Sequence, residues 1–167
     1  MKKNNSSRTP RPRSEFDEQV IQVDRVTRVV AGGRRMRFRA AVVVGNRKGK
    51  VGLGIAKSDE VATAVKKAVN QAKKNMINVA LFKDTIAHHV KSKFKSSVVI
   101  LMPAYTGTGV IAGGSVRTVV ELAGINNILS KSHRSNNKIN TAYATLKALA
   151  ALRMVEEPAK SAQGTEK

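Results

Sequence analysis

The sequence has no cysteine and no tryptophan, and its aromatic residues are two tyrosines and four phenylalanines in 167 residues. The absence of cysteine excludes disulfides, thiolate zinc sites and cysteine nucleophiles. The scarcity of aromatic side chains predicts a small, aliphatic core. A chain of this length is expected to form one domain of ordinary size or two small ones.

Long apolar runs are missing as well. A run such as Val98 to Met102, which no other exceeds, is far shorter than the roughly 18 residues that a membrane-spanning helix needs. Residues 1–13 are basic but contain no apolar segment of the kind that secretory signals carry. We therefore expect a soluble, intracellular protein.

Acidic residues are scarce: there are 11, against 31 Lys and Arg, which gives a net charge of +20. Such a charge indicates a polyanionic partner, either nucleic acid or an anionic membrane surface. Most of the acids lie near the termini or at the start of an expected helix, while Asp24, Asp84 and Glu121 stand alone. No carboxylate pair and no nucleophile with a base is visible, so we expect no enzyme and no cofactor.

A metal site is not expected either. His88 and His89 are adjacent, and neighbouring side chains on a strand point to opposite faces, so the two cannot chelate one ion. His133 is distant in sequence, and no cysteine is available to complete a ligand set.

The stretch from Arg25 to Ser58 contains ten Lys and Arg residues and no acid. Within it, Arg35, Arg37 and Arg39 alternate with apolar residues, so in a strand one face is basic and the other, apolar face is hidden. Like charges this close destabilise each other, and the stretch offers no acid to pair them. We favour RNA contact over the alternative of a merely solvated sheet face.

The first half of the chain predicts a three-stranded antiparallel sheet packed on one helix. The strands are expected at 20–30, 35–44 and 51–56, with turns at Gly32-Gly33 and at 45–49. In the third strand small residues such as Gly52 and Gly54 alternate with bulky ones, which suits close approach of another element to the backbone. Ser58 or Asp59 is expected to cap a helix that runs to about Met76.

The second half predicts an α/β unit with two helices. Strands are expected at 88–94 and 97–102, with a further extended piece from 125 to 129. One helix ends at Gly124, and another runs from about Ile139 to Met154. The predicted organisation is an arm at 1–14, domains at 15–80 and 84–155 that meet near 78–84, and a tail at 156–167. The arm either orders on a phosphate backbone or is simply solvated.

The glycine-rich segment 107–114 precedes the first of these helices. Gly107, Gly109 and Ala112 match the spacing of a dinucleotide fingerprint, but no βαβ unit surrounds them, and Ser115 occupies the position where a P-loop needs Lys. A cofactor loop is therefore rejected. Contact with an anion or an RNA backbone and a tight structural turn stay open as equal alternatives.

A polar loop at 130–138 mixes cations, hydroxyls and amides and contains no acid. Each of these groups can donate to a phosphate or a 2′-hydroxyl, so RNA contact is favoured over a solvated loop. The predicted RNA-binding residues are Arg25, Arg28, Gly32, Gly33, Arg34, Arg35, Arg37, Arg39, Arg47, Lys48, Lys50 and Lys57, together with Lys131, Ser132, His133, Arg134, Asn136, Asn137 and Lys138.

Several of these motifs resemble one known family. The segments 29–35, 51–54 and 73–76 are similar to the amino-terminal half of small-subunit ribosomal protein five, and 107–114 followed by Arg117 is similar to the signature of its carboxyl-terminal half. The resemblance implies an α+β fold: a double-stranded-RNA-binding-like domain with a three-stranded sheet and a helix, then a four-stranded α/β domain with two helices.

The resemblance also implies a function. It implies a structural, cytoplasmic constituent of the small ribosomal subunit that binds ribosomal RNA, supports assembly and decoding fidelity, and lies near the messenger entry channel. Gly107, Gly109 and Arg117 would meet ribosomal protein four, and ribosomal protein eight is a further expected partner. Neither a membrane nor a second copy of the chain is expected as a partner. The rivals are a DNA-compacting protein, which would prefer duplex DNA, and a phosphotransferase, which would bind ATP.

Overall fold

A computed structural model of the chain describes residues 15–153. The expected arm at 1–14, the tail at 156–167 and the last residues of the second expected domain lie outside these residues. The elements follow the order β1 (Asp17–Val30), β2 (Gly33–Gly45), β3 (Lys50–Ser58), α1 (Val61–Lys74), β4 (Met76–Asn78), β5 (Leu81–Phe82), β6 (Thr85–Ile86), β7 (Val90–Phe94), β8 (Ser97–Pro103), β9 (Val110–Ile111), α2 (Gly114–Ala123), β10 (Ile128–His133) and α3 (Lys138–Ala150).

The N-terminal half is an antiparallel sheet in the order β1-β2-β3-β4, with α1 against one face. The sheet and its helix confirm the α+β prediction, and the short strand β4 adds a fourth strand to the three expected. Buried alanines of α1 pack on Ala40, Val42 and Val44 of β2. These small and β-branched side chains form a thin aliphatic layer, as the composition predicts.

Gly52 and Gly54 let α1 lie directly on β3. A Cβ at Gly52 would overlap the carbonyl oxygen of Ala72, and a Cβ at Gly54 would overlap that of Ala68. The element expected to approach this strand is therefore the protein's own helix. The clean alternation of bulky and absent side chains along β3 follows from that contact.

The start of α1 differs from the prediction. Ser58 is the last residue of β3, and the N-cap position is Glu60, whose side chain makes no capping hydrogen bond to the backbone. Instead, Glu60 accepts a hydrogen bond from the Thr63 hydroxyl at 3.1 Å. Asp59 pairs with Arg37, so the carboxylate expected to cap the helix binds the neighbouring strand.

The C-terminal half is a second sheet, in the order β7-β8-β10-β9, with α2 and α3 against one face. Strand β9 runs parallel to β10, and the other pairs are antiparallel. Four strands and two helices agree with the predicted α/β unit. The expected loop at 130–138 begins as strand, because Ser130–His133 pair with β8, and α3 ends at Ala150 rather than near Met154.

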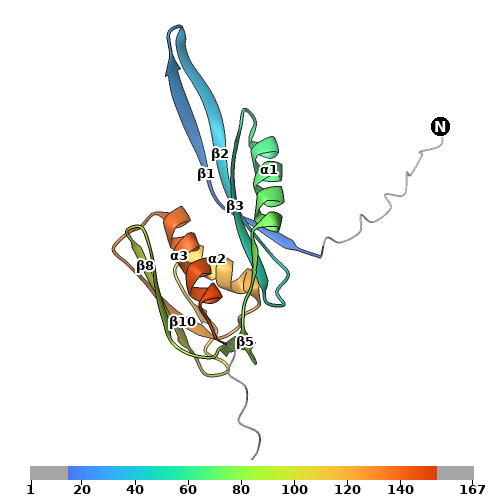
Figure 1. Cartoon of the computed structure of the whole chain (residues 1–167), viewed down its shortest axis with the longest axis vertical. Coiled ribbons are helices and arrows are strands. Elements are labelled where there is room, and N and C mark those ends of the chain that lie inside the picture. Colours follow the sequence, from blue (N-terminus) through green and yellow to red (C-terminus); the bar gives the residue numbers. More distant parts are fainter. Residues whose placement is uncertain (1–14, 154–167) are drawn as a thin grey trace, which may run out of the picture.

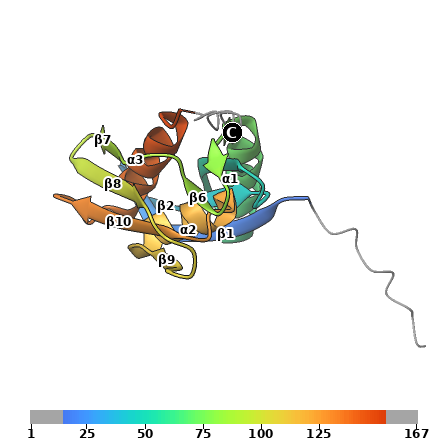
Figure 2. The same cartoon turned by 90° about the horizontal axis from the view of Figure 1, so that it is seen from below.

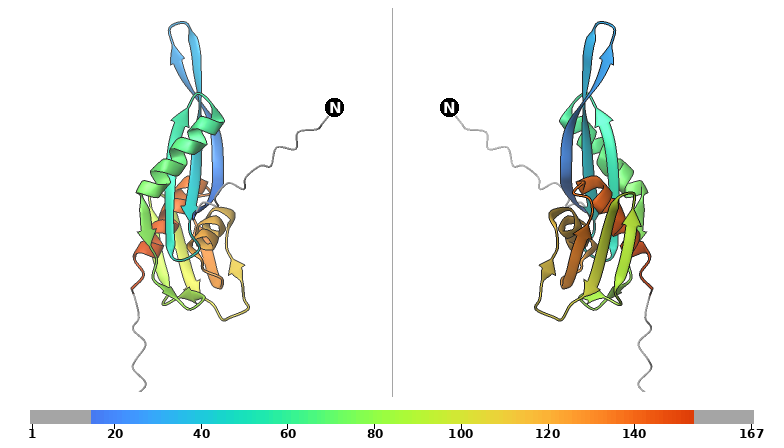
Figure 3. Two further views of the ribbon diagram at one scale, coloured as in Figure 1. Left: turned by 90° about the vertical axis from the view of Figure 1, so that its right-hand side faces the viewer. Right: turned by 90° about the vertical axis from the view of Figure 1, so that its left-hand side faces the viewer.

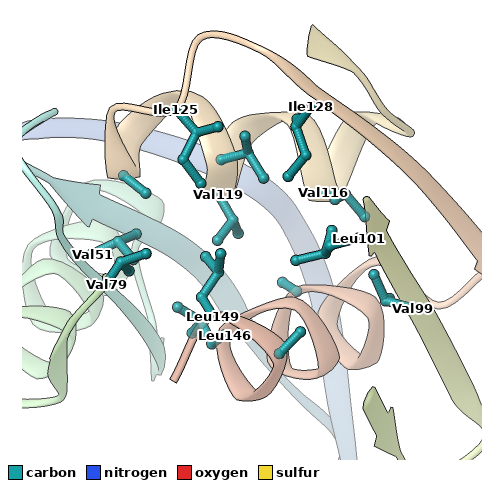
Figure 4. Close-up of a cluster of buried hydrophobic side chains, with 14 of the residues drawn as sticks. Val51, Val79, Val99, Leu101, Val116, Val119, Ile125, Ile128, Leu146 and Leu149 are labelled. Atoms are coloured by element: carbon teal, nitrogen blue, oxygen red, sulfur yellow. The ribbon is translucent and has the colours of Figure 1, made fainter. Parts of the chain in front are cut away.

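One hydrophobic cluster joins the two halves. Val43, Val51 and Leu53 of the first sheet belong to the same buried cluster as Leu101 and Leu149 of the second half. Figure 4 shows Val51 and Val79 facing the side chains of α2 and α3. Helices α2 and α3 thus lie between two sheets, and α1 covers the far side of the first sheet (Figure 2). The division into separate domains stays a prediction.

The second turn is built into this junction. The amides of Arg47 and Gly49 donate to the carbonyls of Leu122 and Ala123 at 3.0 and 2.8 Å. These carbonyls lie in the last turn of α2, where no intrahelical donor is available. Gly124, with a φ of 93°, ends the helix as predicted.

Candidate nucleic-acid interface

The hairpin formed by β1 and β2 extends well beyond the end of α1 (Figures 1 and 3). Val30 pairs with Gly33, so Ala31 and Gly32 form the turn, and Gly33 has a positive φ of 140°. The turn therefore lies where the glycine pair predicts it. Beyond α1 both faces of the hairpin are exposed, so it presents two surfaces.

The first surface carries the alternating arginines. Directly paired residues share a face, and the register pairs Arg35 with Arg28, Arg37 with Val26, and Arg39 with both Asp24 and Lys57. Further down β2 the same face holds Val43, which packs in the cluster shared with α2 and α3. The basic face is thus the exposed continuation of the face that binds the C-terminal half.

Acids from outside the basic stretch pair with some of its arginines. Asp24 binds Arg39 at 2.7 Å, Asp59 binds Arg37 at 2.9 Å, and Asp17 binds Arg47 at 2.8 Å. The expectation that these charges have no acid to pair with is wrong for those three arginines. The acids adjoin the stretch in sequence or lie on the neighbouring strand, where a linear reading does not place them.

Four arginines of the hairpin have no such pairing. The side chains of Arg25, Arg28, Arg34 and Arg35 form no hydrogen bond or ion pair within residues 15–153. Arg28 and Arg35 are direct cross-strand partners, an arrangement of like charges that destabilises a sheet. An anion lying between them would relieve this repulsion.

The second hairpin surface is not hidden, contrary to the prediction. Met36 is 45% exposed and Val29 is 75% exposed, because α1 does not extend as far as this part of the hairpin. Arg25 and Arg34 lie on this surface, since they pair with Phe38 and Val29. The tip therefore offers cations on both sides.

Asp24 marks the place where the hairpin meets the C-terminal half. Hydrogen bonds from Arg39 and then Gln22, with the added positive charges of Arg39 and Lys138, lower the pKa of the Asp24 carboxyl, although burial opposes this shift. Lys138 is the first residue of α3. The basic strand face and the polar segment before α3, predicted separately, are thus neighbours.

The polar segment supplies two kinds of residue. Asn137 caps α3: its side-chain oxygen accepts from the amides of Ile139 and Asn140 at 3.1 and 3.2 Å, so it has a structural role. Asn136, Lys138 and Ser132 line a cavity of about 380 Å³ together with Val20 of β1 and the start of α2. Lys131, His133 and Arg134 are exposed but do not line this cavity.

The glycine-rich segment resolves into a fixed turn and a helix start. The amides of Gly107 and Gly109 both donate to the side-chain oxygen of Asn127, at 3.1 and 3.0 Å. With positive φ values of 93° and 74°, these two glycines form the structural turn that was one of the two alternatives. Their amides are occupied and cannot bind an anion. Arg117 is exposed on α2.

The turn at 46–49 lies apart from the hairpin tip. It follows the other end of β2, a strand of 13 residues, which corresponds to about 40 Å of extended chain. Lys48 and Lys50 are exposed there. The acid-free stretch therefore forms two separate basic sites and not one surface.

Sequence reasoning missed Lys91 and Lys93. Both are exposed on β7 and alternate with Ser92, which is buried. This alternation is the signal that could have placed them on an exposed sheet face. Within residues 15–153 no group of His, Asp or Glu could hold a metal ion, and no helix is long and apolar enough to cross a membrane.

Comparisons with known proteins cover most of the chain. Residues 16–80 match the family described as ribosomal protein S5, N-terminal domain, and residues 92–162 match ribosomal protein S5, C-terminal domain. Proteins named small ribosomal subunit protein uS5 in three strains of Campylobacter jejuni are each 55% identical over 141 residues, which cover 84% of this chain and 96% of theirs. These relatives are named as ribosomal proteins and not as enzymes. The chain belongs to the ribosomal protein S5 family.

Proposed function

We propose that this chain, a structural constituent of the small ribosomal subunit, binds ribosomal RNA through its projecting hairpin and the polar segment at its base. Family membership supports the place in the subunit. The observation that carries RNA binding is the pair Arg28 and Arg35, two like charges held face to face without an acid. Binding of RNA phosphates between these two arginines would release counterions that are condensed on the RNA. It would also fix the orientation of the protein without reading the base sequence.

The test compares unpaired with paired arginines. We expect Arg28→Gln/Arg35→Gln to weaken binding to small-subunit ribosomal RNA about tenfold or more and to lower the salt dependence by nearly two phosphate contacts. Arg37→Gln/Arg39→Gln removes the same charge but breaks ion pairs with Asp59 and Asp24, so it should lower stability more than RNA affinity. Equal loss of affinity in both double variants would contradict the proposal.

The proposal extends to assembly and decoding fidelity. Arg117 is exposed, and the amides of Gly107 and Gly109 both donate to Asn127, so an exposed cation and an ordered turn support contact with a protein partner here. We assign it to ribosomal protein four; ribosomal protein eight is proposed as a second partner. Arg117→Ala should weaken copurification with protein four and raise misreading by reconstituted subunits. Unchanged misreading would contradict this assignment.

A position near the messenger entry channel would bring the hairpin tip close to incoming mRNA. Arg34 and Arg35 have no partner there among the described residues, whereas Arg37 is bound to Asp59. If the tip helps to open structured mRNA, Arg34→Gln/Arg35→Gln should slow unwinding by assembled ribosomes, and Arg37→Gln should have a smaller effect. Unwinding at the normal rate in the double variant would remove this part of the proposal.

A further inference from the structure

The outer face of the second sheet has an ordered arrangement of charge. On β8, Ile100 pairs with Lys91 of β7 on one side and Lys131 of β10 on the other. Two residues away, Val98 pairs with Lys93 and His133 in the same way. Because directly paired residues share a face, a central apolar strand lies between two polar, basic rows.

This face points away from the helices. The intervening residues Ser92 and Val99 are buried, and Phe94, on their side of β7, stacks on Tyr143 of α3 with ring centroids 4.9 Å apart. Lys91 and Lys93 therefore face outward. The right-hand view of Figure 3 shows β7, β8 and β10 from this outer side, opposite the first sheet.

No acid balances the charge of this face. We call its polar residues the basic platform: Lys91, Lys93, Lys131, His133 and Arg134. No platform residue forms an ion pair within residues 15–153. Glu121 is the only acid between Asp84 and Glu156 in the sequence, and it belongs to α2.

The chemistry between the two rows distinguishes among nucleic acids. A groove there is lined by Val98, Ile100 and most of the platform, with no Phe, Tyr or Trp side chain. Proteins that hold single strands on a sheet stack successive bases on several aromatic rings, whereas the only ring that lines this groove is the imidazole of His133. The rows are two strand spacings apart, about 10 Å, so they can contact two separate phosphate strands.

We propose that the basic platform binds double-stranded RNA by its phosphates, with one backbone strand along β7 and the other along β10. The inference rests on the proposed function and extends it, because it adds Lys91 and Lys93 and a second surface on the opposite half of the protein from the hairpin tip. It also gives Lys131, His133 and Arg134 a specific role, as one of the two rows. Contact through phosphates predicts affinity that depends on salt and on duplex form and not on base sequence.

The experiment uses the full chain freed of RNA and a fluorescent RNA duplex of about 20 base pairs, longer than the roughly 16 that a double-stranded-RNA-binding domain spans. Lys91→Gln/Lys93→Gln is compared with Lys66→Gln/Lys147→Gln, which removes the same charge from exposed positions on α1 and α3. We expect the platform variant to lose about tenfold in affinity and nearly two phosphate contacts in salt dependence, and the control to lose less than half of that. Equal losses would overturn the inference.

Contact between the platform and RNA inside the subunit can be tested with single cysteines, because the chain has no cysteine of its own. Lys93→Cys and Lys66→Cys each create a unique thiol for a tethered iron chelate that cleaves nearby RNA in reconstituted small subunits. Cuts in both strands of an RNA helix from position 93 support the platform. Cuts in unpaired RNA only, or none because a protein covers the face, overturn it.

The outcomes separate this inference from the function on which it rests. If the hairpin variant loses affinity for ribosomal RNA while the platform variant behaves like its control, RNA binding by the protein stands and the platform fails. If neither variant loses affinity, both fail. The platform variant is also tested with a single-stranded RNA of the same sequence. If it loses as much affinity for that RNA as for the duplex, the platform proposal fails, because the face was assigned to two backbone strands.

Discussion

Arg39 donates two hydrogen bonds to a single carboxylate oxygen of Asp24, from Nη2 at 2.7 Å and Nε at 3.2 Å. The two residues are cross-strand partners at the base of the hairpin, and Gln22 donates to the other oxygen of the same carboxylate at 2.6 Å. Charge-assisted bonds of this kind are stronger than neutral ones. These hydrogen bonds thus hold the two strands of the hairpin together where it leaves the rest of the protein.

Asp24→Asn should lower stability in a way that depends on pH. The folded-state pKa of Asp24 lies below its unfolded value of about 3.9, so its stabilising effect is complete above about pH 4 and is lost as the pH falls through the folded value. The free energy of unfolding should therefore differ between the variant and the wild type at pH 7, and the two should converge below about pH 4. Urea titrations across this range measure the difference.

A double-mutant cycle with Arg39→Gln gives the control for this result. The two substitutions remove the same hydrogen bonds, so their effects at pH 7 should be less than additive. Full additivity would show that Asp24 acts through other neighbours.

Arg35→Gln should raise the stability of the isolated protein. It removes one member of the like-charged cross-strand pair with Arg28, and such pairs cost roughly 0.2–1 kcal/mol. The gain should shrink in high salt, because screening already weakens repulsion between exposed charges. Thermal melts at low and high salt measure it, and a variant less stable than the wild type at low salt would contradict the prediction.

Gly54→Ala should destabilise the protein strongly. Its Cβ would overlap the backbone carbonyl of Ala68, and a helix backbone cannot yield as a flexible side chain does. Overpacking of this kind costs about 1–3 kcal/mol. Gly32→Ala is the matched control, since nothing lies within 4 Å of its Cβ position, and its midpoint in urea should stay close to that of the wild type.

Leu53→Ala should destabilise both halves together. Leu53 is 2% exposed and belongs to the cluster that includes Leu101 and Leu149, and truncation of a buried leucine costs about 2–5 kcal/mol. Both tyrosines, Tyr105 and Tyr143, lie in the C-terminal half, and there is no tryptophan, so tyrosine fluorescence reports on that half. Its unfolding transition should shift to lower urea by the same amount as the transition followed by circular dichroism of the whole chain. Separate transitions would show that the halves unfold independently.

Local features could be predicted from the sequence because short-range sterics decide them. The glycine pair gave the hairpin turn, Gly124 gave the end of α2, and the small residues of β3 indicated the approach of another element. The alternation of Arg35, Arg37 and Arg39 likewise placed them on one face of a strand. None of these features depends on distant residues.

Features that depend on tertiary pairing were missed. Asp is a residue type that often caps helices, but Asp59 is bound by Arg37 on the adjacent strand. No local sequence pattern indicates that Arg37 competes with the helix for this carboxylate. Ser130 to His133 read as a loop because they are polar, yet pairing with the apolar strand β8 makes them a strand. The turn at 46–49 has the exposed basic side chains that were predicted, but the hydrogen bond from its Arg47 amide to the end of α2 was not foreseen.

The shared core also limits how the protein can meet its RNA. A chain with two independent domains on a linker could adjust to two RNA segments at any angle. Here Val43 and Leu53 of the first sheet are buried with Leu149 of α3, and the turn at Arg47 is hydrogen-bonded to α2. The shared core therefore holds the base of the hairpin and the second sheet in one relative orientation. RNA that contacted both would have to adopt the angle between these two surfaces.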